Sequence, residues 1–410
     1  MASSGVWAPS AGDEVAPVGL AVSPATTHST APDMRTTSRM ERTTGATASE
    51  SVPAPSPPPA RPRTRGSLLA TLAAVAVSGF VWLACTQPLP YYAIAPGSAV
   101  DTSLLVSVSD DHAHPPEGRI LLTTVSLGKV TLLEALEGWL DPAVDVIEER
   151  LIAPPDIDEA EFRRQNLLAM DESKKKALGV AFEALGFDAI TGAGAEVVQV
   201  EAGTPADGVL VAGDAIVAVD GDAVGLDIDA IRLIGQRRPG ETVTLDIVGA
   251  DGAERTETVT LVARPDDGTR AYLGVALTTR DLAFDFPFEV DLRSEQIGGP
   301  SAGLAFALQV IDLLTEGELT GGATVATTGT IELDGSVGAV GGVAQKTIAV
   351  RRAGATLFLV PSSELELARR FAGADLRVEA VDSLDQALAA LATVGGNGLA
   401  LPDLGAEGAS

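Results

Sequence analysis

The sequence contains a single cysteine, Cys85, so no disulfide can form within the chain. Histidine is almost as scarce, because His28, His112 and His114 are the only three. Lysine is rare in the C-terminal third, where Lys346 is the only one after residue 270 although the same stretch holds several arginines. A Ser-His-Asp triad in that part would need a histidine from far upstream, so any nucleophile there needs another base.

Positive charge is also scarce, since the sequence has 56 acidic residues but only 28 Lys and Arg. Such a balance would repel nucleic-acid phosphates, so no nucleic-acid partner is expected. Solubility or tolerance of high salt explains this charge better than a specific basic partner does, and we assign no function to it.

Two further groups of motifs are missing. No Gly-x-x-x-x-Gly-Lys-Ser/Thr loop occurs, because Gln345 stands where such a loop would have the glycine before its lysine. No Cys/His cluster has metal-ligand spacing either. We expect no ATP, no metal and no other cofactor.

The first 66 residues are rich in Ala, Ser, Thr and Pro and predict a disordered cytoplasmic tail. An overlong gene model that truly starts at Met34 or Met40 remains an alternative. Residues 67–86 form an uncharged apolar run of the length that a transmembrane helix needs.

Basic residues stay on the cytoplasmic side, and Arg61, Arg63 and Arg65 precede the run. The sequence therefore predicts a single-pass membrane protein whose later part is extracytoplasmic, with Tyr91 and Tyr92 near the outer interface. A cleavable signal peptide is the competing interpretation.

A glycine-rich turn carries the candidate nucleophile, Ser301, in the run Gly298-Gly299-Pro300-Ser301-Ala302-Gly303. Pro300 suits the first turn of a helix, where backbone N–H groups point outward and favour negative charge. The turn therefore predicts an oxyanion site at the start of a helix. Lys346 could supply the base, since burial can deprotonate an amine but not a guanidinium. A surface lysine on a helix is the competing interpretation.

Several short motifs in order resemble the proteolytic domain of Lon-type serine peptidases. They are the serine turn, Thr328-Gly329-Thr330-Ile331-Glu332-Leu333-Asp334-Gly335, Val337-Gly338 and Gly341-Gly342-Val343-Ala344-Gln345-Lys346. The resemblance implies a Ser301–Lys346 dyad, Thr328 close to the lysine amine, and an oxyanion hole of backbone N–H groups at Ser301, Gly299 and Gly298. This chain departs from the family at Gly298, where aspartate is usual, and at Ile297, where lysine is usual.

Between the anchor and this domain lie two further regions. Residues 91–186 look like the juxtamembrane α/β module of bacterial proteins that join a PDZ domain to a Lon-type peptidase. Residues 187–268 resemble a PDZ domain, on the runs 195–200, 203–208 and 213–221. Short β-branched runs between Gly-Asp and Asp-Gly turns independently predict a small β-rich domain.

A PDZ domain adds an extended peptide, often a free C-terminus, as a strand beside a helix. The Gly-rich segment Gly192, Ala193, Gly194 and Ala195 is the predicted carboxylate-binding loop. A PDZ fold that merely spaces the peptidase from the membrane is the competing interpretation.

Residues 270–394 alternate strands and helices and predict a mixed α/β peptidase domain, followed by a disordered tail at 395–410. The expected fold class is thus multidomain α+β with one N-terminal transmembrane helix. The expected function is an ATP-independent serine endopeptidase acting on polypeptides at the membrane. A silent or latent PDZ-based binding scaffold is the alternative, and the oligomeric state, including a homo-oligomer, stays open.

Overall fold

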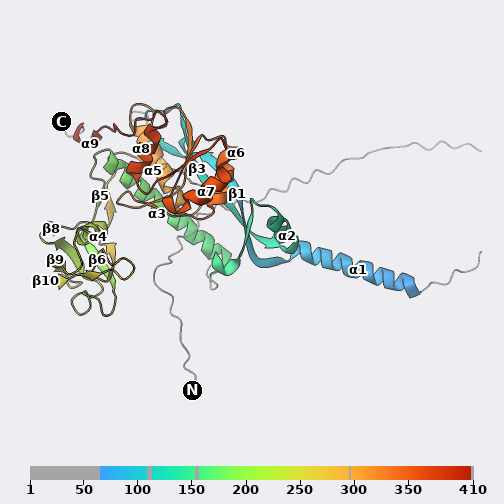
Figure 1. Ribbon diagram of the computed structural model, residues 1–410, viewed down its shortest axis with the longest axis horizontal. Coiled ribbons are helices and arrows are strands. Elements are labelled where there is room, and N and C mark those ends of the chain that lie inside the picture. Colours follow the sequence, from blue (N-terminus) through green and yellow to red (C-terminus); the bar gives the residue numbers. More distant parts are fainter. Residues whose placement is uncertain (1–64, 109–112, 153–156, 295–296, 408–410) are drawn as a thin grey trace, which may run out of the picture.

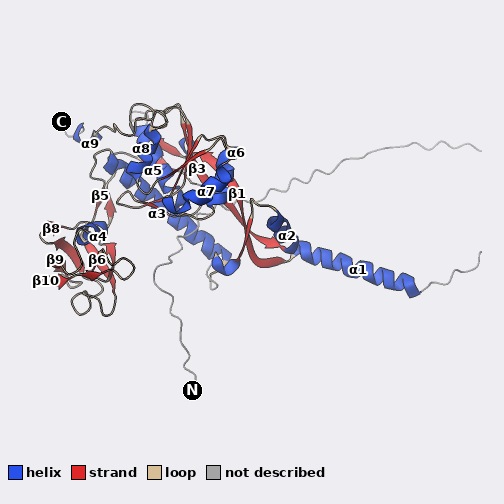
Figure 2. Ribbon diagram, in the orientation of Figure 1, coloured by secondary structure: helices blue, strands red, loops and turns tan. Residues whose placement is uncertain are grey.

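The computed structural model of the chain describes residues 65–108, 113–152, 157–294 and 297–407. The tail predicted for residues 1–66 therefore lies almost entirely outside the described residues. The fold is a multidomain mixture of helices and strands, as expected (Figures 1 and 2).

The first described element is helix α1 (Arg65–Thr86), which projects from the folded part of the chain (Figure 1). Its window Leu69–Thr86 is long and apolar enough to cross a membrane and is not buried against the protein. The bounds of α1 agree with the apolar run that the sequence shows at residues 67–86.

A six-stranded sheet forms the centre of the molecule, with the strand order β20-β19-β16-β3-β1-β4. Its strands are β1 (Pro88–Asp101), β3 (Arg119–Thr131), β4 (Asp145–Glu148), β16 (Thr324–Thr327), β19 (Leu357–Val360) and β20 (Arg377–Ala380). β3 pairs in parallel with β16 and antiparallel with β1.

The pairing of β3 with β16 joins residues that we expected in two domains, 91–186 and 270–394. An unpaired edge on the buried strand β16 would leave its peptide groups without partners, and β3 supplies them. The juxtamembrane segment is therefore part of the sheet that carries the peptidase residues and not a separate module.

Helices cover both faces of this sheet. Side chains alternate along a strand, so that Ile120 and Leu122 of β3 face one core while Leu121 faces the other. The first core contains α3 (Glu159–Ala184), α5 (Gly303–Leu314) and α8 (Leu384–Ala392). The second contains α6 (Val343–Arg352) and α7 (Leu365–Ala372).

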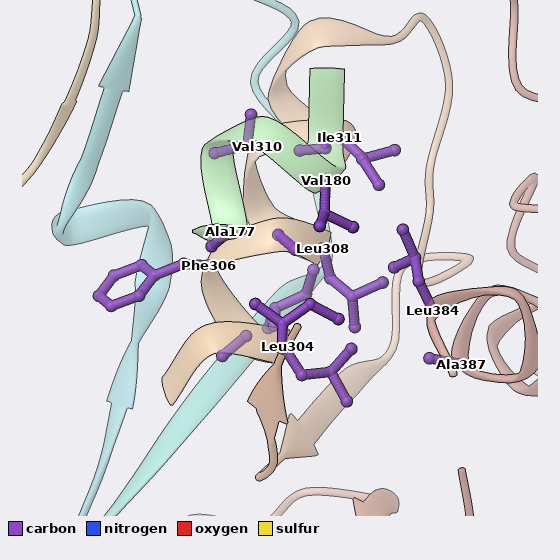
Figure 3. Packing of buried hydrophobic residues seen from close by; sticks show 14 of the residues in the cluster. Ala177, Val180, Leu304, Phe306, Leu308, Val310, Ile311, Leu384 and Ala387 are labelled. Atoms are coloured by element: carbon purple, nitrogen blue, oxygen red, sulfur yellow. The ribbon is translucent and has the colours of Figure 1, made fainter. Parts of the chain in front are cut away.

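Figure 3 shows the first core from close by, where Ala177 and Val180 of α3 lie beside Leu304 and Leu308 of α5, with Leu384 of α8 on the other side. Every residue of α5 is buried. Because α5 follows the serine turn directly, this packing fixes the position of the turn.

A second sheet, with the order β10-β9-β7-β6-β13, belongs to the PDZ part of the chain. Its strands are β6 (Ala195–Val200), β7 (Ala215–Val219), β9 (Thr242–Val248), β10 (Glu254–Thr260) and β13 (Val275–Thr279). Helix α4 (Asp227–Gly235) lies against β6, β7 and β13. We predicted that the PDZ domain ends at residue 268. The structure extends it beyond that residue, because β13 pairs with β6.

The PDZ sheet is inserted between two short strands that pair with each other, β5 (Ile190–Thr191) and β14 (Ala283–Phe284). The chain therefore leaves the peptidase part and returns to it at neighbouring positions. Figure 1 shows the labelled PDZ strands together with α4, at the opposite end of the molecule from α1.

The C-terminal segment was expected to be disordered from residue 395. The structure instead places residues 395–407 on the body of the protein, ending in the short helix α9 (Leu404–Glu407). Leu401 and Leu404 pack against the first core, and the N–H of Leu404 donates to Leu185 O at 2.9 Å. Apolar burial, which the Gly-rich composition concealed, holds this segment.

The remaining elements are short. They are β2 (Val106–Val108), β8 (Asp222–Ala223), β11 (Val262–Ala263), β12 (Ala271–Tyr272), β15 (Val290–Leu292), β17 (Thr330–Ile331), β18 (Val337–Gly338) and α2 (Leu132–Leu140).

Candidate active site

The serine turn adopts the conformation that its sequence favours. Gly299 has φ 86° and ψ 152°, in the region that residues with a Cβ rarely occupy. Pro300 then opens the 3₁₀ turn η4 (Pro300–Ala302), which runs into α5. Ser301 thus lies at the entrance of a buried helix, with 6% of its surface exposed.

Lys346 lies in the first turn of α6 and points into the protein. Its side chain is completely buried, and its Nζ donates a hydrogen bond to Thr328 Oγ1 at 2.9 Å. No salt bridge of Lys346 occurs among the described residues. A buried amine with a hydroxyl partner and no carboxylate partner favours its neutral form.

Burial lowers the pKa of Lys346 from its ordinary value of 10.5 to about 7, and the negative charge of Glu364 opposes this shift only in part. The direction follows from the cost of placing an ammonium ion where no water or carboxylate compensates it. At neutral pH a large fraction of the amine is therefore free to accept a proton.

Thr328 connects the lysine to the serine turn. Its Oγ1 accepts from Lys346 Nζ and donates to the backbone oxygen of Ser301 at 3.4 Å. The N–H of Gly329 donates to the same oxygen at 3.1 Å. The structure thus places Thr328, from the segment after β16, between the Lys346 amine of α6 and the backbone oxygen of Ser301 in η4.

Helix α3 also holds the serine turn, which the sequence did not suggest. The N–H of Gly299 donates to Asn166 O at 2.7 Å, and Ser173 Oγ donates to Pro300 O at 2.9 Å. No local signal could have revealed these contacts, because α3 lies more than a hundred residues upstream in the sequence.

The contact with Asn166 bears on the predicted oxyanion donors, Ser301, Gly299 and Gly298. The N–H of Gly299 is occupied in this conformation, so it cannot at the same time receive a substrate oxyanion. The expectation for Gly299 therefore does not fit the turn as it stands.

The predicted carboxylate-binding loop, Gly192 to Ala195, does not offer free N–H groups at its centre. The N–H of Ala193 donates to Arg280 O at 2.8 Å, and that of Gly194 to Gly225 O at 3.0 Å. The segment closes the PDZ part at its base instead of facing a ligand. The glycines serve this close packing, since a Cβ on Gly192 would lie 2.5 Å from Gly225 O.

The edge of the PDZ sheet offers a better position for a peptide. Among the strands that the structure describes, β13 pairs with β6 alone, and α4 lies next to it. At the start of β13 a surface pocket of about 470 Å³ is lined by residues that include Arg264, Tyr272 and Gly274. A free strand edge beside a helix is the arrangement to which an added peptide strand binds.

Within the described residues, no group of three or more His, Cys, Asp or Glu side chains is placed to hold a metal ion.

Comparison with known proteins matches two regions of the chain. A model of the Lon protease (S16) C-terminal proteolytic domain matches residues 296–393, and a PDZ-domain model matches residues 176–261. The Lon match begins after β1 and β3, although both strands share its sheet.

Similar sequences point the same way. Lon protease of Clostridioides difficile (strain 630) is 51% identical over 63 residues, which make up 15% of this chain and 8% of that protein. Lon protease 1 of Herpetosiphon aurantiacus is 38% identical over 82 residues, or 20% of this chain and 10% of that protein. The chain thus matches only a small part of these relatives.

Among solved structures, the PDZ domain of the SdrC-like protein from Listeria monocytogenes is 29% identical, with 21% of this chain and 87% of that chain covered and a TM-score of 0.20. The corresponding domain from Listeria innocua is 25% identical, with 20% and 92% covered and a TM-score of 0.19.

The fold and the family matches together define a protein that joins a PDZ domain to a peptidase domain. The peptidase domain is of the Lon (S16) serine-protease type.

Proposed function

We propose that this chain is an ATP-independent serine endopeptidase, anchored to the membrane by α1, with Ser301 as nucleophile and Lys346 as general base. The observation that carries the proposal is the buried Lys346 amine, which has Thr328 as its hydrogen-bond partner and a pKa of about 7. The sequence contains no phosphate-binding loop that would couple cleavage to ATP.

In the proposed mechanism, Ser301 Oγ attacks the scissile carbonyl carbon while neutral Lys346 takes the hydroxyl proton. The resulting ammonium then gives this proton to the leaving amine. In the second half, neutral Lys346 takes a proton from water as the water oxygen attacks the acyl-enzyme, and the ammonium returns that proton to Ser301 Oγ as the carboxylic acid product leaves. Thr328 orients the amine through its 2.9 Å hydrogen bond. The Ser301 N–H is the proposed oxyanion donor, and removing one such donor typically costs about 3 to 4 kcal/mol in the transition state.

The proposal is tested by incubating the purified protein with an unfolded polypeptide and identifying the fragments by mass spectrometry. We expect internal cleavage without ATP and none with Ser301→Ala. Equal fragment yields from both proteins would contradict the proposal, as would cleavage that appears only when ATP is added.

Membrane anchoring is proposed from the length and apolarity of α1, with the basic residues before it on the cytoplasmic side. The peptidase and PDZ parts would then lie outside the cytoplasmic membrane, where polypeptides must be already unfolded or be captured by the PDZ domain.

A latent enzyme is a second candidate, favoured by the hydrogen bond between the N–H of Gly299 and Asn166 O. Peptide binding to the PDZ part could act on the serine site through a pocket between the two parts. Leu226 and Ile228 of the PDZ part line this pocket together with Leu333 and Gly335 of the peptidase part. The latter two residues follow β17, which begins two residues after Thr328. A fluorophosphonate that labels Ser301 distinguishes the candidates. A latent enzyme reacts faster after a PDZ peptide is added, whereas a preassembled one reacts at the same rate.

A further inference from the structure

Helix α2 (Leu132–Leu140) turns a large apolar surface away from the protein. Leu133 and Leu136 are each 46% exposed, Trp139 is 62% exposed and Leu140 is 85% exposed. Positions three, four and seven apart lie on the same side of a helix. These four side chains, which we call the α2 apolar face, therefore form one continuous patch.

The opposite side of α2 is built for close packing on the protein. Ala135 and Gly138 are its buried residues, and a Cβ added to Gly138 would lie 2.7 Å from Val146. Small residues thus face the sheet while the large apolar ones face outward. This distribution is the reverse of that expected for a surface helix in water.

The exposure is not the result of a poorly formed helix. Thr131 accepts from Glu134 N, and the carboxylate of Glu134 accepts from Thr131 N at 2.8 Å, which completes a capping box. Such caps stabilise the first turn of a helix in a defined orientation. The α2 apolar face is therefore held in a fixed position.

The register of the sheet places α2 at the level of the membrane anchor. α1 ends at Thr86, and Pro88 of β1 is paired with Thr131, the N-cap of α2. Neighbouring strands lie about 5 Å apart, so α2 begins beside the end of α1. Contacts between the two helices agree with this placement, and Figure 1 shows α2 at the junction of α1 with the folded part.

We propose that α2 lies in the outer interface of the membrane that α1 spans, with the α2 apolar face among the lipids. This inference rests on the proposed membrane anchoring. Tryptophan favours the headgroup region, and Leu side chains favour the acyl boundary beneath it. The sequence had suggested Tyr91 and Tyr92 as interfacial residues, but Tyr92 is only 5% exposed and belongs to a core cluster.

The charges on α2 define the type of lipid surface. Glu134 and Glu137 lie on the flank between the apolar face and the buried side, and the helix has no basic residue. Anionic lipid would therefore oppose binding, and apolar burial must provide the attraction. A zwitterionic surface is sufficient, and α2 would hold the sheet and the peptidase site at a fixed orientation to the membrane.

Single-tryptophan variants of the full chain test this inference. The sequence has three tryptophans, Trp7, Trp82 and Trp139, so Trp7→Phe with Trp82→Phe leaves Trp139 as the only emitter. In phosphatidylcholine vesicles with acyl chains brominated near the headgroups, we expect the lipid to quench Trp139 and to protect it from acrylamide. A second variant, Trp7→Phe with Trp139→Phe, leaves Trp82 as the only tryptophan, and its quenching shows in parallel whether α1 is in the lipid.

The possible results distinguish a wrong position of α2 from a failure of the proposed membrane anchoring by α1. Quenching of Trp82 by lipid with Trp139 open to acrylamide overturns the inference and leaves α1 in the membrane. Protection of Trp139 from both quenchers also overturns it, since a second copy of the chain would then cover the face. Absence of lipid quenching at both tryptophans removes the anchoring and the inference with it.

A pair of leucine variants adds a quantitative control. Leu136→Glu with Leu140→Glu should lower the lipid quenching of Trp139 by about twofold or more, because each places a charge in the acyl boundary. Leu104→Glu, at a residue that is 74% exposed in the 3₁₀ turn η1 (Thr102–Leu104) after β1, should leave it unchanged. Equal quenching in all three proteins contradicts the inference.

Discussion

Lys346 is the residue on which the proposed chemistry depends. It is the only lysine after residue 270, it is completely buried, and its amine has Thr328 as hydrogen-bond partner. A guanidinium in the same place would remain protonated, so charge alone cannot replace it.

Substitutions of the proposed base should separate its charge from its basicity. We expect Lys346→Arg and Lys346→Ala each to lower kcat/KM for a peptide substrate by about 10²-fold or more, as for loss of a general base. Thr328→Val should lose less, about tenfold, because the amine remains but is held less well. Steady-state kinetics, with Ser301→Ala as the inactive reference, measures these effects. Substantial cleavage by Lys346→Arg would remove the amine from the mechanism.

The pKa of about 7 for Lys346 predicts a rise of kcat/KM with pH that levels off above this value. The same shift affects stability. Because the folded-state pKa is below 10.5, the unfolded chain binds more protons between pH 7 and 10.5, and stability rises with pH in this window. The excess stability of Lys346→Met over the unsubstituted protein, from denaturant titrations, should therefore shrink as pH rises from 7 to 10.5. A constant difference would mean that Lys346 titrates alike in both states.

At the scale of elements, the edge of β13 beside helix α4 is the position that we propose for a peptide strand. Thr279 of β13 donates to Asp227 of α4 at 2.7 Å, and Ile231 lies one turn further along the same side of the helix. Ile231 is 53% exposed. Its side chain is therefore available to a peptide added along β13.

A charge at this position should weaken the binding of peptides. We expect Ile231→Asp to raise the Kd of a peptide with an apolar C-terminus by about tenfold, the effect of losing 1.4 kcal/mol. Val198→Asp is the matched control, because Val198 is 56% exposed and lies on β6 on the side away from the buried Ala195 and Val197. Fluorescence anisotropy measures both. A similar loss in the two variants would place the ligand elsewhere or show general damage to the domain.

At the scale of the whole molecule, the PDZ part is an insertion with closely spaced ends. Thr191 of β5 pairs with Ala283 of β14, so a two-residue Asn-Gly turn could replace residues 192–282 and retain this antiparallel pair. The large core of α3, α5 and α8 is formed almost entirely by residues outside the insertion.

Excision of residues 192–282 should therefore separate catalysis from substrate selection. We expect cleavage of a short unstructured peptide to change by less than about threefold, while cleavage of a protein that carries the preferred C-terminus falls by about tenfold or more. Fragment analysis of both substrates provides the measurement. Equal loss on both would assign the domain to folding or activation.

The position of α1 predicts the topology of the whole chain. Protease added to intact spheroplasts should digest the PDZ and peptidase parts, because the basic residues precede the apolar run. If the PDZ and peptidase parts were fully protected in intact spheroplasts and digested only after lysis, the chain would have the opposite orientation in the membrane.

The sequence by itself determined the local elements and nominated the residues of the proposed chemistry. The run 195–200 predicted β6 at its observed bounds, and the apolar run 67–86 predicted α1 to within two residues, because each has a clear pattern and a clear stop. The composition nominated Lys346 as the proposed base, and the Gly-Pro-Ser turn nominated Ser301 as the proposed nucleophile, since these predictions depend on residue type and short spacing.

Only the tertiary structure decided how distant segments meet. It placed β3 beside β16, held Gly299 with Asn166, made Gly192–Ala195 a closed segment, ordered residues 395–407, and left the apolar face of α2 beside α1. Strand pairing and backbone hydrogen bonds between remote segments depend on register and packing, to which every residue type contributes the same N–H and C=O groups. Side-chain identity therefore determined the chemistry that we propose for the site, while the pairing of the backbone determined its surroundings.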